Sequence, residues 1–354
     1  MSVITQLARP EIVAMKGYTS ASHDEALVRL NANESPVRRA GDTTGRGLNW
    51  YPLNRPTELE QRLAGLVHQP VERVTITRGS SEAIDLLIRT FCRPGKDAIL
   101  ICPPTFGMYA VYANVQGAAI QRVPLTSAPA FDLDVAGIDA AIDDSTKLVF
   151  ITSPNNPTGN LMSAAAIDSV VAATRGRAVV VVDAAYWEFA TTDDPAERYA
   201  SEPHVVVLRT LSKAFALAGA RCGLLIGDPD VGTLIRKVFA PYSVATPVVE
   251  AILGVIAHSS PEQDAARMAA IRAERERVSQ RLAALPAVRS VYPSDANFVL
   301  TAFVNPAAAI DAVRRTGFLI RDFSAIDAHP NSLRITIGTP EQNDAVLNAL
   351  GALS

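Results

Sequence analysis

The chain has few of the residues that build metal sites and disulfide frameworks. Its 354 residues include 3 cysteines and 5 histidines. Cys92, Cys102 and Cys222 lie far apart, and none belongs to a C-x-x-C pair. Zinc sites and disulfide-rich folds are recognised by closely spaced cysteines. We therefore expect no metal ion, no disulfide framework and a reducing, cytoplasmic location.

Long apolar runs and excess positive charge are also absent. No run reaches the roughly 20 residues that a membrane-spanning helix needs, and the first residues lack the basic-then-apolar pattern of a signal peptide. The net charge is −3, whereas nucleic-acid-binding proteins usually carry a basic surface. We therefore expect neither a membrane nor a nucleic acid as partner. The apolar share of 48% is that of a globular enzyme.

Short apolar runs alternate with helical segments between about residues 74 and 227. This alternation predicts an α/β fold with a mainly parallel, seven-stranded sheet and helices on both faces. Ligands of such sheets bind at the carboxyl ends of the strands. We expect strands at Val74–Thr77, Ala98–Cys102, Ala119–Val123, Leu148–Thr152, Val179–Val182, Val205–Leu208 and Gly223–Ile226.

Three regions are expected along the chain. Residues 1–45 lack a strong period, so we expect them to form an N-terminal arm with a polar loop. We expect residues 46–240 to form the large α/β domain that contains the seven strands. Residues 241–354 predict a connecting helix near Pro261–Leu285 and a small α+β domain. In the large domain, a helix from Thr57 to Leu66 is expected to begin with a capping box between Thr57 and Glu60. Strands of the small domain are expected near Phe298–Ala302, Phe318–Ile320 and Leu333–Ile337.

The stretch Val205–Gly223 combines a lysine and an arginine after a buried strand. Burial lowers the pKa of an amine, which makes Lys213 a candidate nucleophile for a carbonyl group. The planar guanidinium of Arg221 suits a phosphate. Alternatively, Lys213 is a solvated turn residue and Arg221 meets carbonyl dipoles at a helix end. The Ala- and Leu-rich residues after Lys213 favour a helix.

Small and aromatic residues follow the first two expected strands. Gly79, Ser80 and Ser81 precede a helical run, and a small-residue turn at a helix start offers N–H groups to an anion. A plain serine N-cap is the alternative. Tyr109 follows the second strand and lies either near the ligand edge of the sheet or in the core.

Polar residues also follow the next two strands. The amide of Asn156 can donate to a phenolate-type oxygen. Asp183 directly follows a buried strand, so its carboxylate needs a partner, either a pyridinium N–H or a backbone group. Tyr186 lies three residues further on. Pyridoxal 5'-phosphate (PLP) presents the aldehyde, phosphate, phenolate-type oxygen and ring nitrogen that such a set would bind.

Five segments, in order, carry a resemblance to a known family: RGSSEAIDLLI, CPPTFGMY, SPNNPTG, TLSKAFALAGARCG and KVFAPYSVATP. With LNANESP at Leu30 and LRITIGTPEQND at Leu333, they resemble the fold-type I PLP-dependent aminotransferases of the class II branch. Within that branch the chain is most similar to the histidinol-phosphate aminotransferases. The resemblance covers nearly the whole chain.

The resemblance implies roles toward PLP. Lys213 would bind the cofactor aldehyde and move the catalytic proton, Asp183 would keep the pyridine nitrogen protonated, and Asn156 and Tyr186 would donate to the ring oxygen. Tyr109 would stack on the ring. The cofactor phosphate would be held by Gly79, Ser80, Ser81, Thr210, Ser212, Arg221 and the partner subunit's Tyr51.

The resemblance also implies a substrate side and a homodimer with shared active sites. Arg334 would bind the α-carboxylate of the amino donor, and with Arg321 and Tyr18 it would hold the substrate phosphate. Asn31 and Asn33 would line the substrate loop. This chain has Ser81 where the family often has aspartate, so we expect backbone groups to matter more than side chains there.

The implied reaction is the reversible transfer of an amino group from L-glutamate to imidazole-acetol phosphate. It gives 2-oxoglutarate and L-histidinol phosphate, in histidine biosynthesis. An aromatic amino acid aminotransferase and a threonine-phosphate decarboxylase of the same fold stay open as alternatives. A sensor module of a transcription regulator is not expected, because no basic recognition helix precedes the cofactor-binding pattern.

Overall fold

The central sheet has the seven strands that the alternation predicts. The computed structural model describes residues 2–24, 27–326 and 328–353. The strand order is β1-β7-β6-β5-β4-β2-β3, and β7 runs in the direction opposite to the other six strands of this sheet. The expected mainly parallel α/β sheet is therefore confirmed. The strands are β1 (Val74–Thr77), β2 (Ala98–Ile101), β3 (Ala119–Arg122), β4 (Thr146–Thr152), β5 (Val179–Asp183), β6 (Val205–Thr210) and β7 (Gly223–Ile226).

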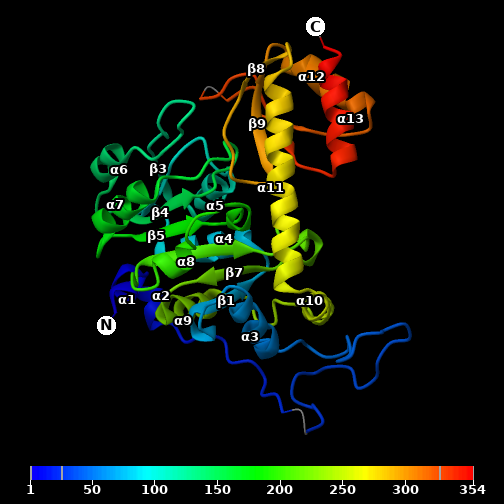
Figure 1. Ribbon diagram of the computed structural model, residues 1–354. Coiled ribbons are helices and arrows are strands. Elements are labelled where there is room, and N and C mark those ends of the chain that lie inside the picture. The colour runs from blue at the N-terminus through cyan, green and yellow to red at the C-terminus, as the bar shows by residue number, and fades with distance from the viewer. Residues whose placement is uncertain (1, 25–26, 327, 354) are drawn as a thin grey trace.

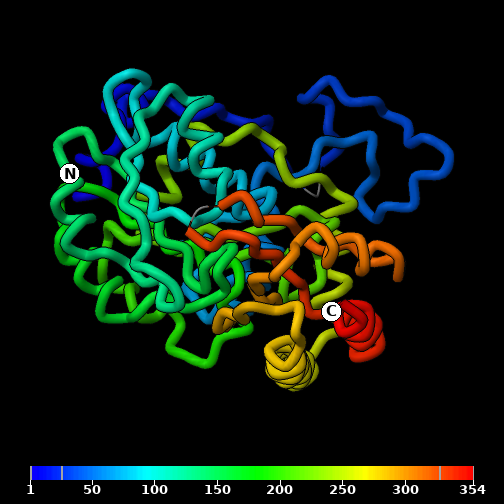
Figure 2. Tube along the Cα trace, turned by 90° about the horizontal axis from the view of Figure 1, so that it is seen from above, coloured from blue at the N-terminus to red at the C-terminus, as the bar shows by residue number. Residues whose placement is uncertain are grey.

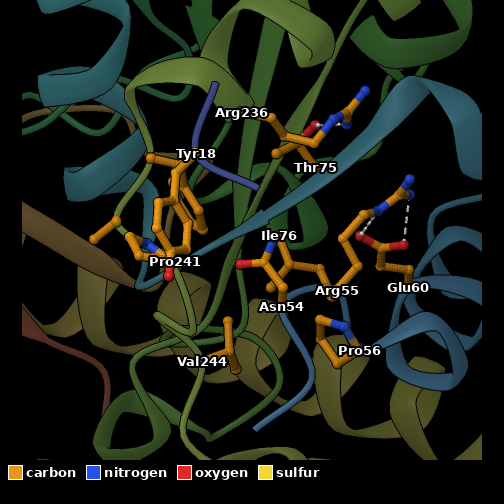
Figure 3. A pocket seen from close by; sticks show the side chains of 12 residues that line it. Tyr18, Asn54, Arg55, Pro56, Glu60, Thr75, Ile76, Arg236, Pro241 and Val244 are labelled. Carbon is orange, nitrogen blue, oxygen red and sulfur yellow. Dashed lines mark hydrogen bonds and ion pairs between the residues drawn. The ribbon is translucent and has the colours of Figure 1, made fainter. Parts of the chain in front are cut away.

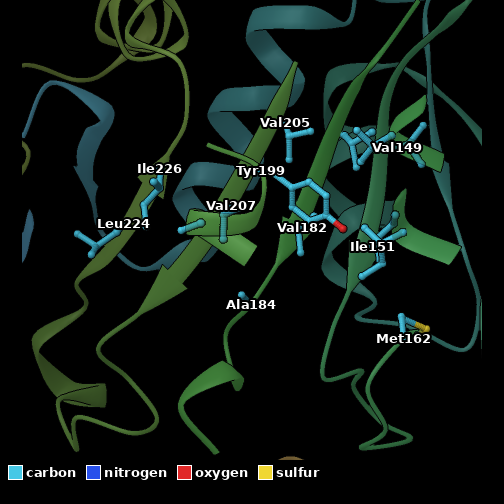
Figure 4. Close-up of a cluster of buried hydrophobic side chains, with 14 of the residues drawn as sticks. Val149, Ile151, Met162, Val182, Ala184, Tyr199, Val205, Val207, Leu224 and Ile226 are labelled. Carbon is cyan, nitrogen blue, oxygen red and sulfur yellow. The ribbon is translucent and has the colours of Figure 1, made fainter. Parts of the chain in front are cut away.

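Helices cover both faces of this sheet because successive strand residues point to opposite sides. Val149 and Ile151 of β4 belong to one core cluster, part of which Figure 4 shows, and Leu148 and Phe150 belong to another. Residues of α3 (Thr57–Leu66), α6 (Val135–Ala141), α7 (Ala164–Thr174), α8 (Pro195–Arg198) and α10 (Thr246–Ala257) pack in the first cluster. Residues of α1 (Val3–Leu7), α2 (Pro10–Ala14), α4 (Ser80–Phe91), α5 (Met108–Gln116) and α9 (Pro229–Val238) pack in the second.

The N-terminal region is only partly the polar loop that its sequence predicts. The two short helices α1 and α2 bury Ile4 and Ile12 against the second core cluster, together with Ala8, the C-cap residue of α1. These residues recur at a spacing of four, but helices of five residues are too short to give a clear period. The chain between α2 and α3 then runs as an arm that extends away from the sheet (Figures 1 and 2).

Two local predictions are wrong. Helix α3 has Pro56 at its N-cap and no capping box, and the Glu60 carboxylate pairs with Arg55 at 2.6 Å instead. The residues after Lys213 form turns and the short 3₁₀ helix η3 (Ala218–Ala220), where a longer helix is expected. The backbone there is not helical, because the Leu217 N–H donates to the carbonyl oxygen of Leu211 and Ala216 has φ +57°.

A second, antiparallel sheet lies at the far end of the long helix α11 (Pro261–Ala283), as Figure 1 shows. Its order is β10-β11-β9-β8, and α12 (Pro306–Arg315) and α13 (Pro340–Gly351) pack against it. The sequence does not predict β8, and the strand expected near Phe318–Ile320 lies at β10. The division at residues 45 and 240 stays a prediction. The strands are β8 (Val288–Val291), β9 (Phe298–Phe303), β10 (Arg321–Asp322) and β11 (Ser332–Thr336).

Further short elements are η1 (Val71–Arg73) and η2 (Trp187–Phe189). Across residues 2–24, 27–326 and 328–353, no helix combines the length and the hydropathy needed to cross a bilayer. Within the same ranges, no group of three or more histidine, cysteine or carboxylate side chains is placed to hold a metal ion.

Candidate active site

A cavity of about 120 Å³ lies at the carboxyl ends of the central strands. Thr152 ends β4, Asp183 ends β5 and Thr210 ends β6, and the sheet register pairs Thr152 with Asp183. The parallel strands therefore bring to one edge the polar residues that follow separate apolar runs in the sequence. The cavity is lined by Ser80, Ser81, Phe106, Thr152, Asn156, Asp183, Ala185, Tyr186, Thr210, Ser212, Lys213 and Arg221.

Lys213 reaches this cavity from the turn that follows β6. Its Nζ lies 5.5 Å from the centre of the Tyr186 ring. Burial lowers the pKa of the amine, and the positive charges of Arg334 and Arg221 lower it further, against the opposing effect of Asp183. A lowered pKa leaves more of the amine neutral and able to attack a carbonyl group.

Asp183 is a buried carboxylate with 3% of its surface exposed. Burial raises its pKa to about 6, while hydrogen bonds from the Tyr109 hydroxyl and the Ala185 N–H, and the charge of Lys213, act in the opposite direction. Tyr109 Oη donates to Oδ2 at 2.7 Å, and Ala185 N donates to Oδ1 at 3.2 Å. Each carboxylate oxygen can therefore still accept a further hydrogen bond, for example from a cationic ring N–H.

An anion cradle forms where helix α4 begins. Gly79 is its N-cap and makes no side-chain cap, so the first N–H groups of the helix are not capped by a side chain. Arg221 lies beside this turn, where its Nη1 donates to Ser212 Oγ at 3.2 Å. A Cβ at Gly79 would lie 2.7 Å from Arg221 Nη2. Helix N–H groups, a guanidinium and a hydroxyl therefore meet as in a phosphate site.

Gly223, the first residue of β7, allows the close approach that this cradle needs. A Cβ on it would lie 2.5 Å from the backbone N of Ser80. Gly223 is paired with Thr210 of β6 and with Thr77 of β1. Any side chain there would push the start of α4 away from the sheet edge.

Arg334 of β11 connects the second sheet to the cavity. Its Nη1 donates to Asn156 Oδ1, and its Cζ lies 4.9 Å from the ring centre of Phe298 and 5.3 Å from that of Phe323. Its Nε is buried and has no hydrogen-bond partner among the described residues. The guanidinium is held in place and still has a free donor for an anionic substrate.

Arg321 provides a second cation on the same side. It lies in β10, directly opposite Arg334 in the register, and its Cζ is 5.8 Å from the Phe323 ring centre. Unlike Arg334, it is exposed. The expected arginine pair is therefore adjacent, with Arg334 half-buried and Arg321 open to solvent.

The placement of Tyr109 contradicts the expectation that it stacks on a ligand ring. Tyr109 is fully buried, and its ring stacks on Phe150 at 4.6 Å. Phe106 lines the cavity instead. Phe106 lies in the loop before α5, whereas Tyr109 is already in the helix and faces the sheet. The sequence segment CPPTFGMY contains both rings, and locating the helix start would have separated them.

Four further predicted residues lie outside this cavity. Tyr18 lines a separate pocket near Pro241 and Asn54 (Figure 3). Tyr51 is about half exposed and stacks on Tyr242 in the arm region, at 4.7 Å. Asn31 donates to the Ser22 carbonyl oxygen at 2.9 Å, and Asn33 is an exposed residue with φ +57°.

The residues present fit PLP. The uncapped start of α4 with Arg221 suits the phosphate, the buried Asp183 suits a cationic ring nitrogen, and Lys213 suits the aldehyde. Phe106 offers an apolar ring on the cavity wall. Asn156 and Tyr186 lie on the same wall and can donate to a ring oxygen.

The solved structures compared with this chain share its fold. A histidinol-phosphate aminotransferase from Sinorhizobium meliloti in complex with pyridoxal-5'-phosphate has a TM-score of 0.75 at 23% identity, covering 85% of this chain and 82% of that one. L-threonine-O-3-phosphate decarboxylase from Porphyromonas gingivalis has a TM-score of 0.70 at 21% identity, covering 85% and 89%. Fold similarity therefore does not separate these two activities.

Sequence comparison is more specific. The profile of the family "Aminotransferase class I and II" matches residues 27–350. The chain is 43% identical over 354 residues to a histidinol-phosphate aminotransferase of Stenotrophomonas maltophilia, covering 99% of this chain and 97% of the relative. The chain belongs to the class I and II aminotransferase family, in its histidinol-phosphate aminotransferase branch.

Proposed function

We propose that the protein is a PLP-dependent histidinol-phosphate aminotransferase of histidine biosynthesis. It exchanges the amino group of L-glutamate with the carbonyl oxygen of imidazole-acetol phosphate and forms 2-oxoglutarate and L-histidinol phosphate. The observation that carries the proposal is the full-length identity of 43% to a relative of that name. The strand-end cavity supports it with an amine, a buried carboxylate and an anion cradle.

The cofactor is PLP, held by the cavity residues. Bound PLP supplies an aldehyde that condenses with amines and a ring that accepts the electrons released at the substrate α-carbon. The uncapped N–H groups at Ser80 and Ser81, the hydroxyls of Thr210 and Ser212, and the Arg221 guanidinium hold its phosphate. Asp183 stays ionised and accepts the hydrogen bond of the protonated ring nitrogen, which strengthens the ring as an electron acceptor.

Lys213 moves the proton. Its amine, with a pKa lowered by burial and by two arginines, takes the proton from the substrate α-carbon and returns it to the cofactor side. Tyr186 and Asn156 donate to the ring oxygen. Burial raises the pKa of Tyr186 to about 12, so its phenol keeps its proton and remains a donor.

Arg334 and Arg321 select the substrates. Glutamate offers two carboxylates and histidinol phosphate offers a phosphate, and a guanidinium binds both kinds of anion bidentately. The half-buried Arg334 fixes one anion near the reacting carbon, and the exposed Arg321 adds charge at the rim. Asn31 and Asn33 line the substrate loop, and Tyr18 helps to hold the substrate phosphate.

The active unit is a homodimer with shared sites. Several large apolar side chains of the arm are exposed, among them Leu27 at 68%, Leu30 at 89% and Leu48 at 56%. Large apolar side chains exposed along one segment favour a protein–protein interface there. Tyr51, which lies outside the cavity of its own chain, reaches the cofactor phosphate of the partner.

A substrate comparison tests the function. Purified protein reconstituted with PLP is assayed with 2-oxoglutarate and either histidinol phosphate or phenylalanine as amino donor, and kcat/KM is compared. In parallel, threonine phosphate is offered and carbon dioxide is measured. We expect a clear preference for histidinol phosphate and no carbon dioxide.

Each alternative has its own outcome in this experiment. A higher kcat/KM with phenylalanine would assign an aromatic amino acid aminotransferase. Release of carbon dioxide from threonine phosphate would assign a decarboxylase. A protein that binds no PLP would contradict the proposal as a whole.

A further inference from the structure

A chain of three buried or half-buried hydroxyls ends on the Asp183 carboxylate. Tyr109 Oη lies 2.7 Å from Asp183 Oδ2 and 2.7 Å from Thr152 Oγ1. Thr152 Oγ1 lies 3.1 Å from Thr105 Oγ1. These residues come from the loop before α5, from α5 itself and from the ends of β4 and β5.

The direction of these hydrogen bonds follows from the number of protons. An ionised carboxylate only accepts, so the single phenol proton of Tyr109 goes to Asp183. The Thr152 hydroxyl must then donate to Tyr109, and the Thr105 hydroxyl must donate to Thr152. All three groups point the same way, and aligned hydrogen bonds in a low-dielectric interior strengthen one another.

Tyr109 is rigid enough to orient its acceptor. Its side chain is fully buried, its ring stacks on Phe150 with an interplanar angle of 19°, and the edge of Phe106 meets it at 86°. Burial and the neighbouring Asp183 charge raise its pKa well above the ordinary value. The phenol therefore stays protonated and remains a donor.

We propose that Tyr109, backed by Thr152, is a positioning residue that keeps Asp183 ionised and oriented toward the pyridine nitrogen of PLP. It occupies one lone pair of Oδ2 from behind and leaves the cavity side of the carboxylate for the ring N–H. This inference rests on the proposed function, because it requires PLP in the cavity.

The inference predicts how PLP affinity depends on pH. The pKa of Asp183 is about 6 with the Tyr109 hydrogen bond in place, and that bond lowers it. The ionised form binds the ring N–H, so affinity is present above this pKa and is lost as the pH falls through it. Removing the phenol hydroxyl raises the pKa of Asp183, so affinity is lost at a higher pH.

The test uses the apoprotein and measures its dissociation constant for PLP by tryptophan fluorescence across the pH range around 6. In Tyr109→Phe we expect affinity above this range to fall about ten- to hundredfold, as for a lost hydrogen bond to a charged group. We also expect the acid limb, which is the pH range in which PLP affinity is lost on acidification, to move to higher pH by about one unit.

Tyr199→Phe is the matched control. Tyr199 is a buried tyrosine that donates to a carboxylate, Asp168, at 2.9 Å in the core cluster of Figure 4, outside the cavity. This variant should keep the wild-type pH profile. Unchanged affinity and acid limb in Tyr109→Phe, or equal losses in both variants, would overturn the inference.

If Tyr109→Phe does not fold, a second pair of variants tests the same inference. Thr152→Val removes the hydroxyl behind Tyr109, and Thr152→Ser keeps it. We expect the acid limb to move up in Thr152→Val and to stay in place in Thr152→Ser. Identical profiles in the two would overturn the inference. A wild-type protein without PLP affinity would instead overturn the proposed function.

Discussion

Arg334 shows how surroundings turn one arginine among many into a candidate specificity residue. Most arginines of this protein lie at the surface, but Arg334 is half-buried between Phe298 and Phe323 and bonded to Asn156. The aromatic faces favour its charge without neutralising it. Its neighbour Arg321 shares the Phe323 ring but faces solvent.

Substitution of Arg334 should weaken the binding of both substrates without weakening the binding of the cofactor. We expect Arg334→Lys to raise KM for glutamate and for histidinol phosphate about ten- to hundredfold, because a lysine lacks the planar fork. Arg321→Ala should have a smaller effect, since exposed charges are screened. Steady-state kinetics and the visible absorption of bound PLP check this.

The control for these variants is Arg314→Ala, which removes an exposed arginine from α12. Its kinetic constants should equal those of the wild type. If Arg334→Lys left both KM values unchanged, the substrate anions would have to bind elsewhere.

At the scale of elements, the anion cradle depends on how closely α4 and β7 approach. Strand β7 runs antiparallel to its neighbours, so its first residue, Gly223, lies at the same edge as the ends of the other strands. The absence of a side chain at Gly223 lets the Ser80 N–H come close to the sheet. Gly79 meets Arg221 in the same way, with φ +82°.

Gly223→Ala should therefore damage both stability and cofactor binding. A Cβ at 2.5 Å from the Ser80 backbone forces α4 to move, and overpacking of this kind costs about 1–3 kcal/mol. We expect a lower Tm for the apoprotein and a higher dissociation constant for PLP.

Gly219→Ala tests whether the effect is specific to position 223 or follows from replacing any glycine of this segment by alanine. Gly219 lies in η3 of the same segment, and a Cβ there would meet nothing within 4 Å. This variant should keep the wild-type Tm and PLP affinity. Equal effects of the two alanines would contradict the close-approach argument.

At the scale of the whole molecule, the arm is the part that its own chain leaves exposed. It extends from the body in both views (Figures 1 and 2). The Tyr242 N–H donates to Asn54, and the Tyr242 hydroxyl accepts from the Ala21 N–H, so the arm is tied down near Tyr51. A second subunit would cover the apolar residues of the arm and receive Tyr51.

Mixed dimers test whether the sites are shared. Lys213→Ala should be inactive and Tyr51→Phe should bind PLP weakly. A heterodimer of the two has one site with both native residues if Tyr51 acts across the interface. Its activity should reach about half that of the wild-type dimer, because one of two equivalent sites is complete. A heterodimer no more active than its parents would show that Tyr51 does not act across the interface.

The central sheet was predictable because its signals are local. Each of the seven apolar runs became a strand, since burial on both faces requires continuous β-branched stretches. The site residues Asn156, Asp183 and Lys213 were also predictable, because residues after parallel strands meet at one edge. Errors arose where packing decides, as at Glu60, which bonds Arg55 instead of capping its helix.

The sequence by itself determined the α/β fold, the family and the set of polar residues at the strand ends. All of these depend on local hydrophobic patterns and ordered motifs. Only the tertiary structure decided which of two nearby rings, Phe106 or Tyr109, faces the cavity and which supports Asp183 from behind. That choice depends on where α5 begins and how it packs on the sheet, because Phe106 precedes the helix and does not follow its period, whereas Tyr109 lies on the helix face that packs on the sheet.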